Sequence, residues 1–160
     1  METVTDYQEI ERYLRDPEGE RDRFWMGPGV YWFDWREYDE DIVRCISESL
    51  PKGAQFRFEV RASALPRGVD ILLEQSGVLS PIPYKPDRMD RDTTLKAVQA
   101  LIAPDWQLRC FAPSLRSDTL GFCLLSGEEW RSLEEAFGTE VVARQFRPVG
   151  PESCMFGLCE

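Results

Sequence analysis

Apolar residues recur at helical spacing, three or four positions apart, in five parts of the chain. Pro66 suits a first helical position and Gly77 a helix stop, while Ser126 and Glu129 have the spacing of a capping box before the stop at Gly138. The pattern therefore predicts five helices, near residues 4–14, 38–50, 66–77, 93–102 and 126–138.

Strict alternation of apolar and polar residues occurs between these helices. Phe56–Arg61 alternates in this way, which predicts a strand with one face in the core and one in water. Gln107–Ala112 and Leu120–Leu125 flank a short polar segment and predict a hairpin, whose second strand is apolar on both faces and therefore central. Val141–Arg147 and Cys154–Leu158 carry weaker strand signals.

Helices and strands are mixed without a strict strand-helix-strand repeat, which favours an α+β fold, a mostly antiparallel sheet with helices packed on it. The loop Ser80–Asp90 is too short to separate two full domains, so residues 1–160 are expected to form a single globular domain. The apolar side of the periodic elements predicts these core residues: Phe58, Leu101, Phe122 and Leu133.

Aromatic residues concentrate in one short segment. Seven of the 19 aromatic residues lie within Phe24–Tyr38. A strand over Gly29–Arg36 would place Tyr31, Phe33 and Trp35 on one face and Val30, Trp32, Asp34 and Arg36 on the other. Two interpretations follow: most of these rings are structural, or several belong to a binding surface.

The same segment leads into an acidic cluster, with five carboxylates in the eight residues Asp34–Asp41. The start of a helix favours one or two acidic residues, but mutual repulsion opposes five unless a partner uses them. Aromatic side chains supply contact energy in interfaces, and carboxylates beside them select a basic partner. The predicted partner-binding residues are Trp32, Asp34, Trp35, Glu37, Tyr38, Asp39, Glu40 and Asp41.

Composition narrows the class of protein. With 29 acidic and 19 basic residues, the net charge of −10 opposes binding to nucleic acid or to an anionic membrane and favours basic surfaces. No run approaches a membrane span, and the start of the chain lacks a secretory signal pattern, so a cytoplasmic location is expected. The five cysteines form no Cys-x-x-Cys pair and are expected to be buried thiols.

Motifs that carry chemistry are scarce. The chain has no histidine, which removes the commonest general base and metal ligand. Gly27 and Gly29 precede a predicted strand, not a helix, so they do not form a phosphate-binding loop. Asp70 and Glu74, one turn apart on the third predicted helix, are the remaining candidates for a carboxylate enzyme. We predict no catalytic residue, no metal site and no cofactor.

As a compact, acidic, histidine-free α+β protein with the aromatic and acidic segment Trp32–Asp41, the chain resembles the immunity proteins that bacteria make against secreted toxins, including those of type VI secretion systems. More narrowly, it resembles those paired with restriction-endonuclease-like nuclease toxins. This resemblance implies a non-catalytic inhibitor that binds a cognate, basic toxin as a monomer or weak dimer. The alternatives are an acidic adaptor domain for another basic protein and a carboxylate-dependent enzyme.

Overall fold

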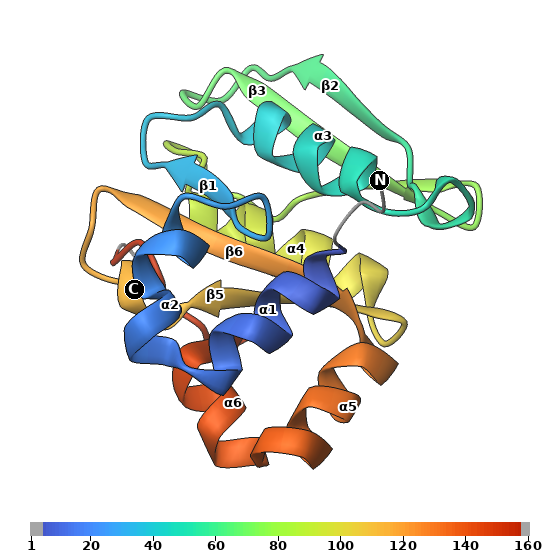
Figure 1. Ribbon diagram of the computed structural model, residues 1–160. Helices are drawn as coiled ribbons and strands as arrows, with labels where there is room; N and C mark the ends of the chain where they lie inside the picture. The colour runs from blue at the N-terminus through green and yellow to red at the C-terminus, as the bar shows by residue number, and fades with distance from the viewer. Residues whose placement is uncertain (1–4, 158–160) are drawn as a thin grey trace. The chain divides into compact units, whose positions relative to one another are not determined.

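A computed structural model describes residues 5–157 of the chain (Figure 1). The described residues form two compact units: the first comprises residues 5–34 and Ala103–Val149, and the second comprises Trp35–Ile102 and residues 150–157. Each unit contains one antiparallel sheet with helices. The predicted α+β fold with antiparallel strands is confirmed, with two sheets in place of the expected one. That residues 1–160 form a single domain stays a prediction.

The sheet of the first unit has four strands in the order β1-β6-β5-β7. All its pairs are antiparallel, and β6 is bonded on both sides, so the predicted hairpin and its central second strand are confirmed. The bounds are β1 Tyr31–Asp34, β5 Trp106–Phe111, β6 Thr119–Ser126 and β7 Phe146–Pro148.

Four helices belong to the first unit: α1 Asp6–Arg15, α2 Pro17–Trp25, α5 Gly127–Phe137 and α6 Thr139–Gln145. The predicted capping box of α5 is present, with reciprocal hydrogen bonds between Ser126 and Glu129, and Gly138 ends the helix at φ 98°. Most of the predicted strand Val141–Arg147 is instead α6, because β7 begins only at Phe146. The described part of the other weak signal, 154–157, forms no strand, and Leu158 lies outside the described residues.

The core of the first unit is rich in aromatic rings. Tyr13 of α1 stacks on Phe24 of α2 with centroids 4.8 Å apart, and both rings pack edge-on against Phe111 and Phe146 of the sheet. Trp130 of α5 joins the same cluster. The helices therefore bury their apolar sides against one face of this sheet.

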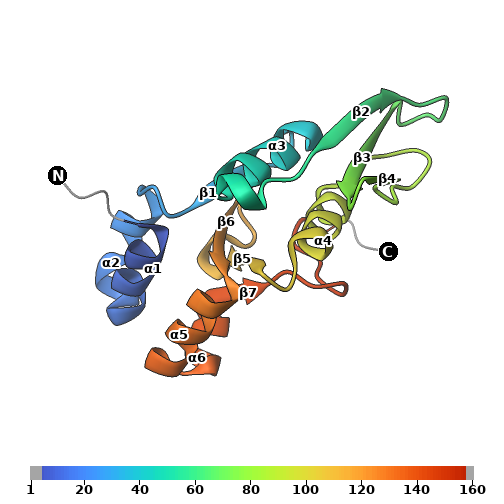
Figure 2. The ribbon, with the colours of Figure 1, turned by 90° about the vertical axis from the view of Figure 1, so that its right-hand side faces the viewer.

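The second unit contains the three-stranded sheet β2-β3-β4 and two helices (Figure 2). The bounds are α3 Asp39–Ser49, β2 Phe58–Ala62, β3 Val69–Gln75, β4 Val78–Pro81 and α4 Arg91–Ile102. Short 3-10 turns occur at Lys52–Ala54 in this unit and at Ala112–Ser114 in the first.

The predicted helix over residues 66–77 is wrong, because these residues form β3 and the turn that follows it. Val69, Ile71 and Leu73 face one side of the sheet, an alternation that a helical pattern through Leu72 obscured. Ser76 and Gly77 both have positive φ, 52° and 79°, as a two-residue hairpin turn requires. Asp70 and Glu74 therefore lie on a strand and not one helical turn apart.

Two of the four predicted core residues are fully buried and two are only half-buried. Phe122 and Leu133 are fully buried, whereas Phe58 and Leu101 are half-buried. Among the cysteines, Cys110 and Cys123 are buried free thiols and Cys45 is half-buried and free. Cys154 is exposed and disulfide-bonded, so the expectation of a buried thiol is wrong there.

Candidate protein-binding surface

The eight predicted partner-binding residues fall into two groups. Trp32 and Asp34 belong to β1 in the first unit, and the other six, Trp35 to Asp41, belong to the second unit, in the turn before α3 and its first residues. The two groups have different surroundings.

Trp32 is a packing residue. Its ring lies 4.7 Å from that of Trp25 and contacts the aromatic core of the first unit. Trp32 pairs with Gly121 of β6, and its ring lies over this glycine: a Cβ added at Gly121 would come within 3.2 Å of the ring. On the opposite face of β1, Phe33 packs 5.5 Å from Phe122. Both faces of β1 therefore carry packed rings, which favours the structural interpretation for this part of the aromatic segment.

Asp39 is buried, at 5 % exposure, so the expectation of a surface carboxylate is wrong for this residue. Its two oxygens accept hydrogen bonds from Thr94 at 2.6 Å and from Arg91 at 3.0 Å. Thr94 is also 2.6 Å from the hydroxyl of Tyr84. Because Thr94 donates its proton to Asp39, Tyr84 donates to Thr94, and the three side chains form a hydrogen-bonded chain inside the second unit.

Opposing effects act on the pKa of Asp39. Burial raises this pKa, since the charged form loses solvation, while the hydrogen bond from Thr94 and the charge of Arg91 lower it. The net direction is upward despite the ion pair, because burial is the largest cause. Burial likewise raises the pKa of Tyr84, which keeps its hydroxyl protonated as a donor.

Arg91 holds the turn before α3 at two points. It donates to the carboxylate of Asp39 and to the backbone carbonyl of Glu37. Tyr38, the residue between them, is 73 % exposed. An internal ion pair thus fixes the backbone on both sides of an exposed aromatic ring, so the ring is presented on a rigid support.

Trp35 is the second exposed ring of this turn, at 55 %. The guanidinium group of Arg36 lies over it, 5.2 Å from the ring centroid. An exposed cation over a tryptophan contributes only about 0.5–1 kcal/mol, so the ring remains available to a partner.

Three carboxylates accompany the two rings. Asp41 is exposed and accepts from Arg44 at 2.8 Å, one turn further along α3. Glu37 and Glu40 are half-buried, and neither side chain forms an ion pair within residues 5–157. The acidic surface is thus smaller than the sequence suggested, because Arg91 neutralises Asp39. We call Trp35, Glu37, Tyr38, Glu40 and Asp41 the α3 surface.

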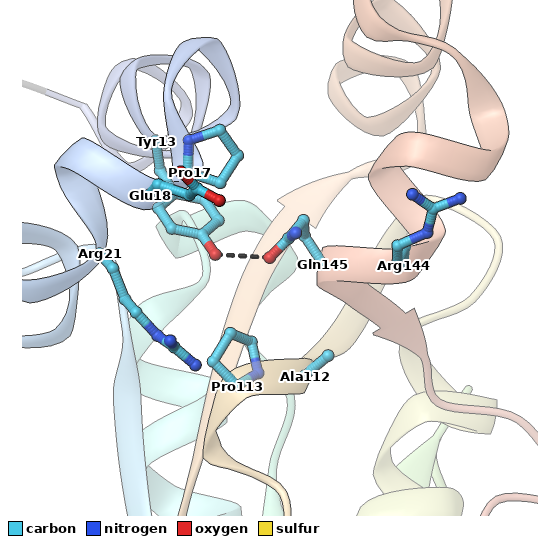
Figure 3. A pocket seen from close by; sticks show the side chains of 8 residues that line it. All are labelled: Tyr13, Pro17, Glu18, Arg21, Ala112, Pro113, Arg144 and Gln145. Atoms are coloured by element: carbon cyan, nitrogen blue, oxygen red, sulfur yellow. Dashed lines mark hydrogen bonds between the residues drawn. The ribbon is translucent and has the colours of Figure 1, made fainter.

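A pocket of about 290 Å³ in the first unit had no sequence signal (Figure 3). The hydroxyl of Tyr13 donates to Gln145 at 2.5 Å, and prolines, an alanine and three charged residues complete the lining: Pro17, Glu18, Arg21, Ala112, Pro113 and Arg144. Figure 3 shows the guanidinium of Arg21 beside Pro113 and that of Arg144 directed elsewhere. Burial raises the pKa of Tyr13, so its hydroxyl is no base at neutral pH. The charged groups do not converge on a single ligand position.

A second pocket, of about 400 Å³, lies beside β2 and β3 and includes Glu59 and Glu74. Glu59 already accepts from Arg61, and Arg57 lines the same pocket. Asp70, the other acid proposed for a carboxylate enzyme, pairs with Arg67 and is not part of this lining.

The described part of the chain contains neither a metal-binding cluster nor a helix that could span a membrane. No group of three or more Cys, Asp or Glu side chains could hold a metal ion there. Within the same residues, no helix has the length and apolar character needed to cross a membrane.

Comparisons with known proteins add no relative. A scan against family models finds no match to this chain, and searches of curated proteins and of solved structures find no similar protein. The resemblance to toxin-immunity proteins therefore stays a prediction.

Proposed function

We propose that this chain is a non-catalytic immunity protein that binds and neutralises a basic, secreted bacterial toxin through the α3 surface. The observation that carries the proposal is the pair of exposed rings beside carboxylates, Trp35 at 55 % and Tyr38 at 73 %, on a turn held by Arg91. Exposed tryptophan and tyrosine on a rigid backbone are typical of the few residues that supply most of the affinity of an interface.

Charge supports a basic partner. The whole chain carries −10, which steers it toward positive surfaces over distances near the Debye length. At the α3 surface, Glu37 and Glu40 form no ion pair within the described residues and can pair with lysine or arginine of the partner. In this proposal the carboxylates speed association, and the rings, once desolvated, slow dissociation.

Two grounds favour a toxin as the partner: the resemblance to immunity proteins, and the acidic and aromatic character of the α3 surface. Toxins that cut nucleic acid need basic clefts to bind phosphates, and an acidic protein with aromatic contacts can cover such a cleft. The chain would then act by occupying the nucleic-acid site, with no chemistry of its own.

Affinity capture from cells of the source organism tests the proposal. We expect the tagged chain to recover a basic protein at low salt. A variant with Glu37, Glu40 and Asp41 changed to lysine should lose it. The matched control changes Glu128, Glu135 and Glu140, exposed or helix-start acids of α5 and α6, to lysine, so the net charge changes equally. Equal recovery by both variants would contradict the α3 surface.

The recovered partner also separates an immunity protein from an adaptor. Expressed alone, a toxin stops growth, and co-expression of this chain should restore it. A partner that is harmless when expressed alone would contradict the immunity proposal and favour an acidic adaptor domain.

A further inference from the structure

The sheet of the second unit has two edge strands, and they differ in the backbone groups that they offer. β2 and β4 each pair with β3 on one side only. An edge strand with free N–H and C=O groups is a template for another strand, and proteins block it with proline, lysine, bulges or a covering segment.

Proline blocks the β4 edge. Ile82 donates to Ile71 at 2.8 Å, so Val78, Ser80 and Ile82 direct their backbone groups toward β3. Pro81 therefore occupies an outward position, where it has no N–H to donate.

The β2 edge is open. Glu74 donates to the carbonyl of Arg57 at 3.0 Å, and Ser63 donates to that of Gly68 at 2.9 Å. With the register of β2 and β3, these bonds direct the backbone groups of Arg57, Glu59, Arg61 and Ser63 toward β3, and those of Phe58, Val60 and Ala62 outward. No hydrogen bond to these outward groups is found within residues 5–157, and Glu59 to Ala62 are all exposed.

We propose that β2 pairs with β2 of a second copy of this chain, antiparallel and centred on Val60, to form a continuous six-stranded sheet. The outward groups of Phe58, Val60 and Ala62 are placed symmetrically about this centre. Phe58 then lies opposite Ala62 of the second copy and Val60 opposite Val60, and all three pairs fall in the hydrogen-bonded positions of an antiparallel ladder. Such a twofold contact is closed, which limits the assembly to two chains.

Charge selects this register. The pairing places Glu59 opposite Arg61 of the second copy, at the non-hydrogen-bonded positions where side chains lie closest. Within one chain, Arg61 donates to Glu59 at 2.6 Å, and both side chains are about half exposed, at 56 % and 50 %, so they can form the cross-strand pairs as well. A centre moved by one residue, to Glu59 or to Arg61, would set like charges opposite each other. The segment is therefore complementary to itself in one register.

Sedimentation velocity of the full chain tests the proposal, at concentrations up to roughly 1 mM so that weak association is visible. We expect the wild type to sediment as a concentration-dependent dimer. Glu59→Arg and Arg61→Glu should each weaken self-association about tenfold, because two opposite-charge pairs become like-charge pairs. An equimolar mixture of the two variants should dimerise again, since each supplies the charge that the other lacks.

A backbone variant makes a second test. Val60→Pro removes the central outward N–H and leaves the bonds to β3 in place, so it should sediment as a monomer with a thermal midpoint close to that of the wild type. A wild type that stays monomeric throughout would overturn the proposal and leave the edge to a different partner. Dimers that survive both charge variants, or a mixture that fails to restore association, would also overturn it.

Discussion

The aromatic segment Phe24–Tyr38 has two halves with similar composition and opposite surroundings. Before Asp34, Phe24 is 2 % exposed and Trp32 packs on Trp25 across a glycine of the neighbouring strand. After Asp34, Trp35 is 55 % and Tyr38 73 % exposed, on a turn held by Arg91. The difference shows that ring content alone does not decide between core and surface. What differs is the surroundings of the backbone. Trp32 lies on a strand of a packed sheet, whereas Tyr38 lies in a turn that Arg91 binds at Glu37 and Asp39.

The largest effect on stability should come from the first half. Phe24→Ala removes a ring that contacts Tyr13 at 4.8 Å and Phe111 at 5.0 Å, and should lower the free energy of unfolding by about 3–5 kcal/mol. Urea denaturation measures this, with Met26→Ala, at a residue 85 % exposed, as a control expected within about 0.5 kcal/mol. Equal losses in the two variants would contradict the assignment of Phe24 to the core.

A somewhat smaller loss of stability is expected from changing Asp39, whose buried carboxylate binds Arg91 and Thr94. Asp39→Ala leaves Arg91 and Thr94 without their carboxylate partner, which should cost about 3 kcal/mol because a buried charge loses its counterion. Asp41→Ala, which breaks the exposed pair with Arg44, is the control and should cost under about 1 kcal/mol. Denaturation of both variants checks this, and an Asp39 variant as stable as the control would show that the turn needs no internal support.

Titration of Asp39 should change the stability of the protein with pH, by less than the two substitutions above. Because burial raises its pKa in the folded state, the folded protein binds the proton more readily than the unfolded chain, whose Asp pKa is about 3.9. The contribution of this residue to stability should thus fall as pH rises from that value through the folded pKa, and then stay level. Asp39→Asn should lack this component. A difference between wild type and variant that grows with pH would mean that the ion pair with Arg91 outweighs burial.

Local signals predicted much of the fold. The capping box at Ser126, the stop at Gly138 and the central position of β6 depend on residues close in sequence or on simple alternation, and all three are confirmed. The strand β3 was mistaken for a helix because Val69, Leu72 and Leu73 also fit helical spacing. The apolar pattern does not predict α2, because this helix has few apolar residues. The signal that could have predicted it is its start, the N-cap Asp16 followed by Pro17.

The candidate site depends on contacts that no local pattern contains. Asp39 is bound by Arg91 and Thr94, 52 and 55 residues away, so its burial could not be inferred from the acidic cluster. The outward groups of β2 likewise depend on its register with β3, a strand that the helical spacing of its apolar residues conceals. Tyr38 lies between the two residues that Arg91 binds, Glu37 and Asp39, so its position depends on the same long-range contacts.

The smallest effect on stability and the most direct test both concern Trp35. Trp35→Ala should change the free energy of unfolding by no more than about 1 kcal/mol, because the ring is 55 % exposed and loses only its exposed contact with Arg36. With the partner recovered by affinity capture, its dissociation rate, measured by surface plasmon resonance, should rise by roughly 30-fold, as expected for an interface residue worth about 2 kcal/mol. Trp32→Ala, at a packing residue, should instead lower stability. If Trp35→Ala releases the partner no faster than the wild type, the α3 surface is not the binding site.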